Sequence, residues 1–369
     1  MNHSVSITNY FKKKKYLEID KGEEKDDSGY KISYNIDMRI KCRLFIIIAV
    51  AVIMTVCGGV RPSILRAAEV SKLGVHLLSP GDLDYAVRLL KLPDNSDKWH
   101  YVTIPLAVKD LSDLKLWQDF FRRCQEMKLI PIVRLATTVE NGSWQRPTRF
   151  QIVRSFDFLN QLPWPTDERL VIAYNEVNHA KEWGGAVDPL SYTHVLEFVL
   201  NWAHTEQANY KILPAAMDLA APNSTQTREA FSYLSEMLQI NPWIFDHIDF
   251  WNSHSYPNPG FSASPTNSGQ NSLRGFQHEL NFIKNRVNRD LEVFITETGW
   301  VDNRVTRPWL SQYYLYAVQH VWSDERVKGV TPFLIRGAPG PFAQFSFFDD
   351  QDLPTPIFKA VQETILETD

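Results

Sequence analysis

The sequence predicts an α/β fold of the (β/α)₈ TIM-barrel class, preceded by a disordered tail and one hydrophobic leader helix. From residue 72 to residue 369, short apolar runs alternate with longer segments whose apolar residues recur every three or four positions. Eight such strand–helix units in one chain favour a closed barrel of parallel strands over an open sheet. No Gly-x-Gly-x-x-Gly motif follows the first apolar run, which also argues against an open dinucleotide-binding sheet.

The expected elements follow one another without interruption by a repeat or a Ser/Gly-rich linker, so we expect a single barrel over 72–369. The eight strands are predicted at 72–78, 100–106, 130–136, 170–176, 211–216, 248–255, 292–297 and 329–335. Helical periodicity is clearest at 111–127, 191–204, 273–287 and 309–322, and a last helix is predicted at 356–366.

The segment before the barrel has three parts. Residues 1–43 are polar and mixed in charge, with too little apolar material to order themselves. Residues 44–60 carry no charge and follow Lys41 and Arg43, a pattern typical of a signal peptide or a membrane anchor. Residues 61–71 would be a linker. A buried core helix is the structural alternative for 44–60, and Met38 is an alternative start that would make this an ordinary secretory signal. Either start predicts an extracytoplasmic domain, secreted or membrane-anchored.

Composition excludes several classes of function. The net charge is −4, and no basic patch is interleaved with aromatic residues, so no nucleic-acid partner is expected. Three cysteines are too few for a disulfide framework, and Cys124 falls in a helical pattern typical of an interior thiol. No Cys-x-x-Cys motif is present, and we expect neither a metal nor a cofactor. Eleven tryptophans and fourteen tyrosines serve either the core or sugar stacking, and both interpretations stay open.

Two glutamates end apolar runs where a barrel would place its reactive groups. Glu176 closes the run LVIAYNEVN at 170–178, and Glu297 closes the run LEVFITETGW at 291–300. A carboxylate at the mouth of a buried strand is costly unless the site uses it. Because the C-terminal ends of all barrel strands meet at one face, the two glutamates are expected in one site.

Other polar side chains also follow these strand ends. Arg134 ends the third expected strand, Asn175 precedes Glu176, and His254 and Tyr256 end the sixth. His254 has an alternative reading as a hydrogen-bonded structural imidazole, and Arg134 as a structural partner of a carboxylate. Two further residues are expected to be structural: His76 as buried scaffolding and Trp251 as packing between strand and helix.

The motifs resemble those of retaining glycoside hydrolases on (β/α)₈ barrels, often called clan A. Asn175-Glu176 resembles the Asn-Glu pair at the end of strand four, and Thr296-Glu297-Thr298-Gly299-Trp300 resembles the strand-seven motif. His254-Ser255-Tyr256 is similar to the His-x-Tyr of cellulase- and mannanase-like families, and the ETGW string to β-1,3-glucanases. The resemblance covers strands four to eight well and the first three poorly.

The resemblance implies a double displacement on a glycan, an oligo- or polysaccharide with β-linkages. It implies that Glu297 is the nucleophile and that Glu176 is the general acid and base. Asn175 would then hydrogen-bond the 2-hydroxyl of the sugar, and Tyr256 would orient Glu297. His254 would contact the sugar or a carboxylate.

Aromatic platforms are less well defined by the sequence. Trp300, just past the nucleophile, and Trp183, in the loop after strand four, are the candidates for stacking on sugar rings. Strand eight lacks the tryptophan of many relatives and offers Phe333 and Arg336 instead. The loops at 136–148 and 258–272 are expected to form polar walls of the cleft.

Three other functions compete with this interpretation. A metal-dependent barrel hydrolase would need His-x-His on strand one, where only His76 occurs. A phosphate-binding barrel would use glycines after strand eight, but prolines beside Gly337 and Gly340 remove backbone donors. A catalytically silent carbohydrate-binding barrel is the non-enzyme alternative that stays open.

Overall fold

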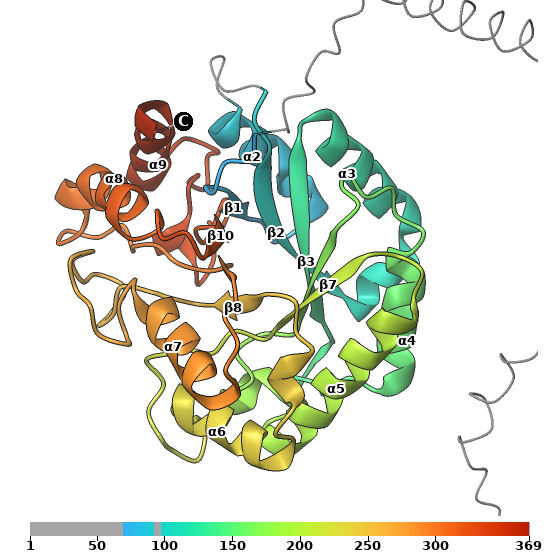
Figure 1. The fold of residues 1–369 in the computed structure, drawn as a ribbon. Helices are drawn as coiled ribbons and strands as arrows, with labels where there is room; N and C mark the ends of the chain where they lie inside the picture. The colour runs from blue at the N-terminus through green and yellow to red at the C-terminus, as the bar shows by residue number, and fades with distance from the viewer. Residues whose placement is uncertain (1–68, 92–96, 369) are drawn as a thin grey trace, which may run out of the picture. The chain divides into compact units, whose positions relative to one another are not determined.

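In the part of the chain that the structure describes, eight parallel strands form a central barrel, and helices surround them (Figure 1). The structure is a computed structural model that describes residues 69–91 and 97–368. The barrel strands are β1 (Val75–His76), β2 (His100–Ala107), β3 (Leu129–Ala136), β6 (Arg169–Ala173), β7 (Tyr210–Pro214), β8 (Trp251–Ser253), β9 (Val293–Ile295) and β10 (Val327–Val330). They lie in two sheets, of order β1-β2-β3-β6-β7 and β10-β9-β8.

Hydrogen bonds at two seams close the sheets into a barrel. At the first seam, beside β1 and β10, Leu73 forms a parallel bridge with Val330, and Gly74 N–H donates to the carbonyl of Val330 at 2.8 Å. At the second seam, beyond β7 and β8, Asp218 forms a parallel bridge with His254. Every pairing around the circle is parallel, which confirms the predicted (β/α)₈ class.

Each barrel strand is followed by a helix that packs against the outside of the barrel (Figure 1). The α-helices are α2 (Leu83–Leu90), α3 (Leu114–Glu126), α4 (Arg149–Leu159), α5 (Pro189–Thr205), α6 (Ala230–Ile240), α7 (Gly275–Val287), α8 (Leu310–His320) and α9 (Pro356–Thr368). Short 3₁₀ helices lie in the connections: η2 (Pro80–Asp82), η4 (Val108–Ser112), η5 (Ala180–Glu182), η6 (Ile244–Asp246), η7 (Arg307–Trp309) and η8 (Ala343–Phe345). The apolar faces of the α-helices and the outward side chains of the strands form the main core. This core contains Cys124, a buried free thiol as expected.

The interior of the barrel is built in layers that change in polarity along the strands. The lowest layer is apolar and includes Tyr101, Ile132, Ile172 and Phe294. Above it lies a layer of hydrogen-bonded hydroxyls and an amide. The hydroxyl oxygens of Thr103 and Thr331 lie 2.8 Å apart. The Thr331 hydroxyl donates to the carbonyl of Thr296, and the Thr296 hydroxyl donates to Oδ1 of Asn252 at 2.6 Å. The charged side chains of the site lie at the top, beyond this polar layer.

Strand alternation explains why polar residues reach the top layer. In β3, Ile130 and Ile132 belong to the interior layer, whereas Leu129, Val133 and Leu135 belong to the outer core. Successive side chains of a strand point to opposite faces, so Arg134 continues the interior row and emerges at the mouth of the barrel.

The sequence prediction for the segment before the barrel concerns residues that the structure describes only in part. The predicted tail at 1–43 and leader at 44–60 lie outside the described residues. Within them, no helix is both long and apolar enough to cross a bilayer. The predicted linker at 61–71 is described only from residue 69, and there Val70 already pairs with Trp99, so the barrel begins inside it.

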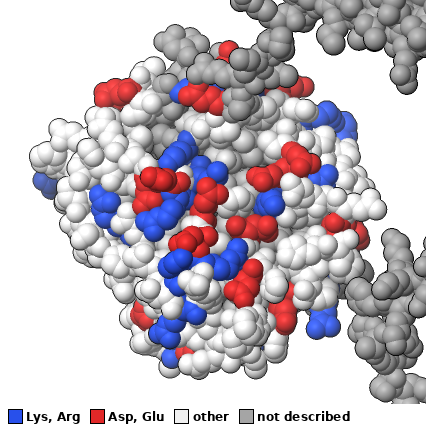
Figure 2. Space-filling view, in the orientation of Figure 1, with Lys and Arg blue, Asp and Glu red and all other residues white. Residues whose placement is uncertain are grey.

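Charge on the described surface is mixed in sign. Figure 2 shows Lys and Arg side chains interspersed with Asp and Glu across one face of the molecule. Such interspersed charges partly cancel, so this face presents no extended positive surface of the kind that binds a nucleic-acid backbone.

Barrel closure requires a residue without a Cβ at Gly74. A Cβ at this position would lie 2.1 Å from the carbonyl oxygen of Tyr101, so an alanine would push the chain away from β2 next to the first seam. We expect Gly74→Ala to lower the free energy of unfolding by about 1–3 kcal/mol. Chemical denaturation monitored by circular dichroism measures the change. Gly269→Ala is the control, because a Cβ there would meet no atom within 4 Å, and an equal loss in both variants would contradict this account of the seam.

Candidate active site

Glu297 follows β9 and lies almost completely buried at the mouth of the barrel, with 10% of its side chain exposed. Arg134 Nη1 forms an ion pair and a hydrogen bond with its Oε1. The hydroxyl of Tyr256 donates to its Oε2 at 3.2 Å. His76 Nδ1 lies 3.7 Å from Oε1 on the other side. The carboxylate therefore accepts hydrogen bonds from β3 and from the segment after β8, and the imidazole of β1 lies nearby.

The surroundings of Glu297 favour its ionised form. Burial alone would raise the pKa of this carboxyl, but the positive charges of His254 and Arg134 and the hydrogen bond from Arg134 outweigh burial and lower the pKa to about 2. His76 does not supply a charge at neutral pH, because complete burial lowers the pKa of its imidazole to about 3. Arg134 is the permanent cation that pairs with Glu297, and Glu297 is ionised at neutral pH.

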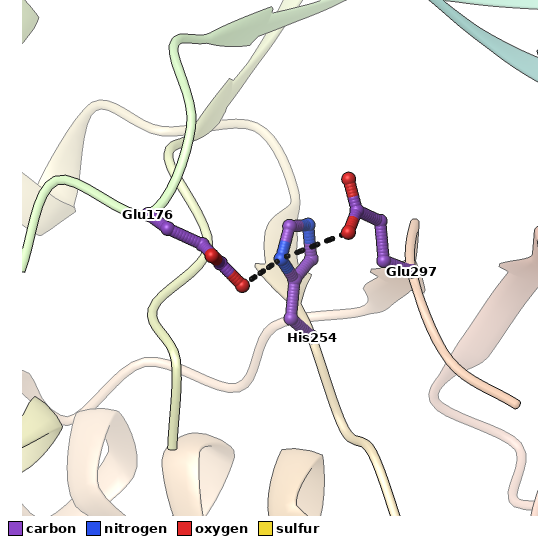
Figure 3. A group of neighbouring side chains, drawn as sticks. All are labelled: Glu176, His254 and Glu297. Carbon is purple, nitrogen blue, oxygen red and sulfur yellow. Dashed lines mark hydrogen bonds and ion pairs between the residues drawn. The ribbon is translucent and has the colours of Figure 1, made fainter. Parts of the chain in front are cut away.

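Glu176 lies on the loop after β6 and faces Glu297 across the imidazole of His254 (Figure 3). His254 Nδ1 lies 2.9 Å from Glu176 Oε1 and 3.8 Å from Glu297 Oε2. One oxygen of each carboxylate and a nitrogen of His254 all lie within 4.8 Å of one another. Glu176 and Tyr174 both have positive φ, at 31° and 75°, so the chain turns sharply here and directs Glu176 over the barrel mouth.

His254 is enclosed, and its charge depends on the two glutamates. Burial opposes its protonation, yet the negative charges of Glu297 and Glu176 and the hydrogen bond to Glu176 outweigh burial, and they raise the pKa of the imidazole above its ordinary value. A protonated His254 balances part of the negative charge of the two carboxylates.

A third carboxylate, Glu182, joins the site through Asn175. Arg134 Nη1 donates to Asn175 Oδ1 at 2.7 Å, and Asn175 Nδ2 donates to Glu182 Oε2 at 3.3 Å. This chain fixes the orientation of the Asn175 amide. Burial and the nearby charge of Glu176 raise the pKa of Glu182, although Asn175 and Arg134 oppose the shift.

His179 and Asp218 form a second polar pair at the cleft. His179 Nε2 lies 2.8 Å from Asp218 Oδ2, and this hydrogen bond is the main reason that the pKa of His179 is raised. Neither this pair nor Glu182 was found from the sequence. Their loop positions follow no period, but all three lie within seven residues of a predicted strand end, and that proximity was the available signal.

The carboxylates of the site line a cleft of about 670 Å³ together with Arg134 and His179. Aromatic rings also line it, and among them are four phenylalanines and the tryptophan of the hairpin formed by β4 (Val139–Glu140) and β5 (Ser143–Trp144). These five are Phe261, Phe333, Phe342, Phe345 and Trp144, and the lining also includes Trp117, Tyr174 and Tyr256. Phe333 belongs to this lining, as the strand-eight sequence suggested, whereas Arg336 pairs with Asp352 and stacks on Tyr85 outside it. The loop at 136–148, expected to be a polar wall, thus contributes an aromatic ring.

Trp300 and Trp183, the two expected sugar platforms, do not reach the cleft, and that expectation is wrong. Trp300 is fully buried, packs on Tyr314 and donates its indole N–H to the carbonyl of Ala263 at 2.8 Å. Trp183 is 1% exposed and donates to Ser191 at 2.6 Å. Their faces are covered by the protein's own side chains, which leaves no surface for a sugar ring. Trp251 packs against Phe245, as expected.

One group of three potential metal ligands occurs in the described residues: Glu176, His254 and Glu297. Arg134 already pairs with Glu297 at this point. A cation there would be repelled by the guanidinium and by a protonated His254, so the donor set does not fit a metal site.

Comparison with known proteins adds information about the fold. Neither the protein-family models nor the curated proteins give a match to the sequence. Among solved structures, a glucosidase from Croceicoccus marinus aligns with a TM-score of 0.58 and 10% identity, over 80% of this chain and 66% of that one. An endo-β-1,4-glucanase from Xanthomonas axonopodis pv. citri with three substitutions aligns with a TM-score of 0.51 and 13% identity, over 81% of this chain and 100% of that one. A GH39 β-xylosidase from Caulobacter crescentus aligns with a TM-score of 0.51 and 14% identity, over 79% of this chain and 70% of that one.

The chain has the fold of the (β/α)₈-barrel glycoside hydrolases. This agrees with the resemblance seen in its strand-end motifs. At these identities the likeness establishes the fold, and the chemistry has to be argued from the site itself.

The buried ion pair predicts a pH-dependent stability. Arg134→Gln should lower the free energy of unfolding at pH 7 by about 3–5 kcal/mol, because it leaves a buried carboxylate without its cation. A carboxyl whose pKa is lowered by folding stabilises the protein above its unfolded pKa, and this contribution disappears as pH falls toward 2. The deficit of the variant should therefore narrow between pH 7 and pH 3, as measured by urea unfolding.

Arg122→Gln is the matched control, because Arg122 pairs with Asp119 on the surface and about half of its side chain is exposed. Its loss should stay below about 1 kcal/mol. Equal losses in the two variants, or a deficit in Arg134→Gln that does not change with pH, would contradict the assigned role of the pair.

Proposed function

We propose that the protein is a retaining glycoside hydrolase that cleaves β-linked oligo- or polysaccharides through a glycosyl-enzyme on Glu297. The observation that carries the proposal is the asymmetry of the two facing glutamates. Arg134 keeps Glu297 ionised. Glu176 is more exposed, and among the charged side chains of the described residues it pairs with His254 alone. Two carboxyl groups in different surroundings are suited to different roles in one reaction.

The spacing of the pair supports a retaining mechanism. Carboxyl groups about 5–5.5 Å apart allow one to attack the anomeric carbon directly, whereas about 6.5–9.5 Å leaves room for the water of an inverting reaction. The closest oxygens of Glu176 and Glu297 lie within 4.8 Å, a short gap that favours direct attack.

The contacts suggest how the two steps would proceed. Glu297 Oε2 or Oε1 would attack the anomeric carbon, while Glu176 gives a proton to the departing glycosidic oxygen. The Glu297 charge is lost when the ester forms, so ionised Glu176 no longer faces a like charge. Glu176 then takes a proton from water, and the resulting hydroxide oxygen attacks the anomeric carbon and releases Glu297.

Other side chains would position the sugar and the nucleophile. Asn175, which Arg134 and Glu182 hold by hydrogen bonds, would bond a sugar hydroxyl beside Glu297. Tyr256 orients the nucleophile, and His254 balances charge between the two carboxylates. No metal or cofactor has a role in this mechanism.

A β-linked glycan is the substrate class that we propose. Aromatic rings in the same cleft as the carboxylates, among them Phe333, Phe345 and the hairpin residue Trp144, fit the apolar faces of sugar rings. The three compared enzymes are a glucosidase, an endo-β-1,4-glucanase and a β-xylosidase. A silent carbohydrate-binding barrel is not favoured, because binding alone would give no use to a buried ionised glutamate. The uncharged segment at 44–60 supports action outside the cytoplasm.

Conservative changes at the glutamates test the proposal. Glu297→Gln and Glu176→Gln should each lower hydrolysis by a factor of about 10² or more, since one removes the nucleophile and the other the proton donor. The assay is a panel of β-linked polysaccharides with reducing-sugar detection. Glu363→Gln, an exposed carboxylate on α9 that accepts from Ser311, is the control. Hydrolysis by both site variants at the rate of the parent would refute the assignment.

Trp144 tests the aromatic wall separately from the chemistry. Trp144→Ala should raise KM by a factor of about 10, because it removes a ring surface that contacts substrate, and should leave kcat within a factor of about 2. Steady-state kinetics on the best polysaccharide of the panel measure both. Trp243→Ala, at a tryptophan that is 68% exposed and does not line the cleft, should change neither constant. An unchanged KM in Trp144→Ala would remove the hairpin from the substrate site.

A further inference from the structure

A fourth glutamate, Glu279, is completely buried and has no part in the mechanism above. It lies on α7, outside the barrel wall, with 0% of its surface exposed. The hydroxyl of Ser253 donates to Glu279 Oε2 at 2.5 Å, and Ser253 Oγ lies 2.7 Å from Ser255 Oγ. Glu279 Oε1 has no close hydrogen-bond partner. A buried carboxyl that is only half satisfied is costly, so its presence calls for an explanation.

The alternation of the chain through β8 connects Glu279 to the site. Ser253 and Ser255 point outward to α7, where Ser255 Oγ also accepts the backbone N–H of Phe276 at 2.8 Å. His254 and Tyr256 alternate with these serines and point inward, to Glu176 and Glu297. The outward contacts of Glu279 thus hold the backbone that carries two inward contacts of the site.

Charge links the two faces of the strand as well. No Lys or Arg forms an ion pair with Glu279 in the described part of the chain, and His254 is the titratable group that acts on it. Burial raises the pKa of Glu279 to about 7, although the hydrogen bond from Ser253, the nearby Trp251 and the positive charge of His254 act against this shift. Its charge therefore changes in the neutral range, next to an imidazole whose own charge matters for the site.

We propose that Glu279 is a positioning residue. From the outer face of the strand it sets the orientation and the charge of the His254 imidazole, and so it couples α7 to the glutamate pair. Ionised Glu279 would favour protonated His254, and neutral Glu279 would not. On the site side, His254 also interacts with Glu297, Glu176, Arg134 and Asp218. The kinetic consequence rests on the proposed hydrolase function, whereas the electrostatic link between Glu279 and His254 does not.

Histidine titration of the full-length protein tests this link directly. In protein carrying ¹⁵N-labelled histidine, the signal that is lost in His254→Asn identifies His254, and its shift is followed from pH 5 to pH 9. We expect Glu279→Gln to lower the titration midpoint of His254 by on the order of one pH unit, and to abolish a second inflection near pH 7. Where the parent hydrolyses a glycan, the pH profile of kcat should move in the same direction with KM unchanged.

Two further variants keep the test decisive. Ser253→Ala leaves the carboxyl but removes its donor, which favours the neutral acid, so the midpoint of His254 should fall here too, even if Glu279→Gln does not fold. Glu363→Gln also removes a carboxylate that accepts from a serine, but at the surface on α9, and should leave His254 unchanged. A His254 midpoint and inflection unchanged in both Glu279→Gln and Ser253→Ala would overturn the proposal. A parent that shows the shifts but no hydrolysis would instead refute the proposed function.

Discussion

The ion pair between Arg134 and Glu297 is the interaction on which the rest of the site depends. A carboxylate buried this deeply would take up a proton unless a permanent cation lay beside it. Arg134 is that cation, and it also donates to Asn175, whose amide in turn reaches Glu182. Fixing one charge therefore orders a chain of side chains across the mouth of the barrel. His254 and Tyr256 complete the enclosure from the strand opposite.

The barrel makes such a site possible because its interior becomes more polar step by step. An apolar layer below and a layer of hydrogen-bonded threonines above it separate the charges from the bottom of the barrel. Thr296, the residue before Glu297, accepts a hydrogen bond from Thr331 and donates one to Asn252, so these polar groups beneath the charged layer are paired. Closure at Leu73–Val330 and Asp218–His254 then holds all eight strand ends in one ring.

The sequence predicted the eight strands and the strand-end residues, because both follow from period and order. Arg134, Glu176, His254 and Glu297 lie at the mouth as expected, since alternation and the shared direction of parallel strands place them there. Loop conformation follows no such rule, so the hairpin that carries Trp144 was not foreseen. Trp300 and Trp183 lie near the right strand ends, but the sequence does not reveal which way a ring turns after a sharp backbone bend. Glu279 was also missed, since nothing in a helical pattern marks a carboxyl that faces a strand.

The central claim is that Glu297 acts as a covalent nucleophile, and one measurement addresses it most directly. The protein is incubated with an activated 2-deoxy-2-fluoro glycoside of the sugar it hydrolyses, then digested, and its peptides are examined by mass spectrometry. The account predicts a single added glycosyl group on the peptide that contains Glu297, with loss of activity in proportion to labelling. A label on Glu176 instead, or hydrolysis that continues with no label on any peptide, would contradict it.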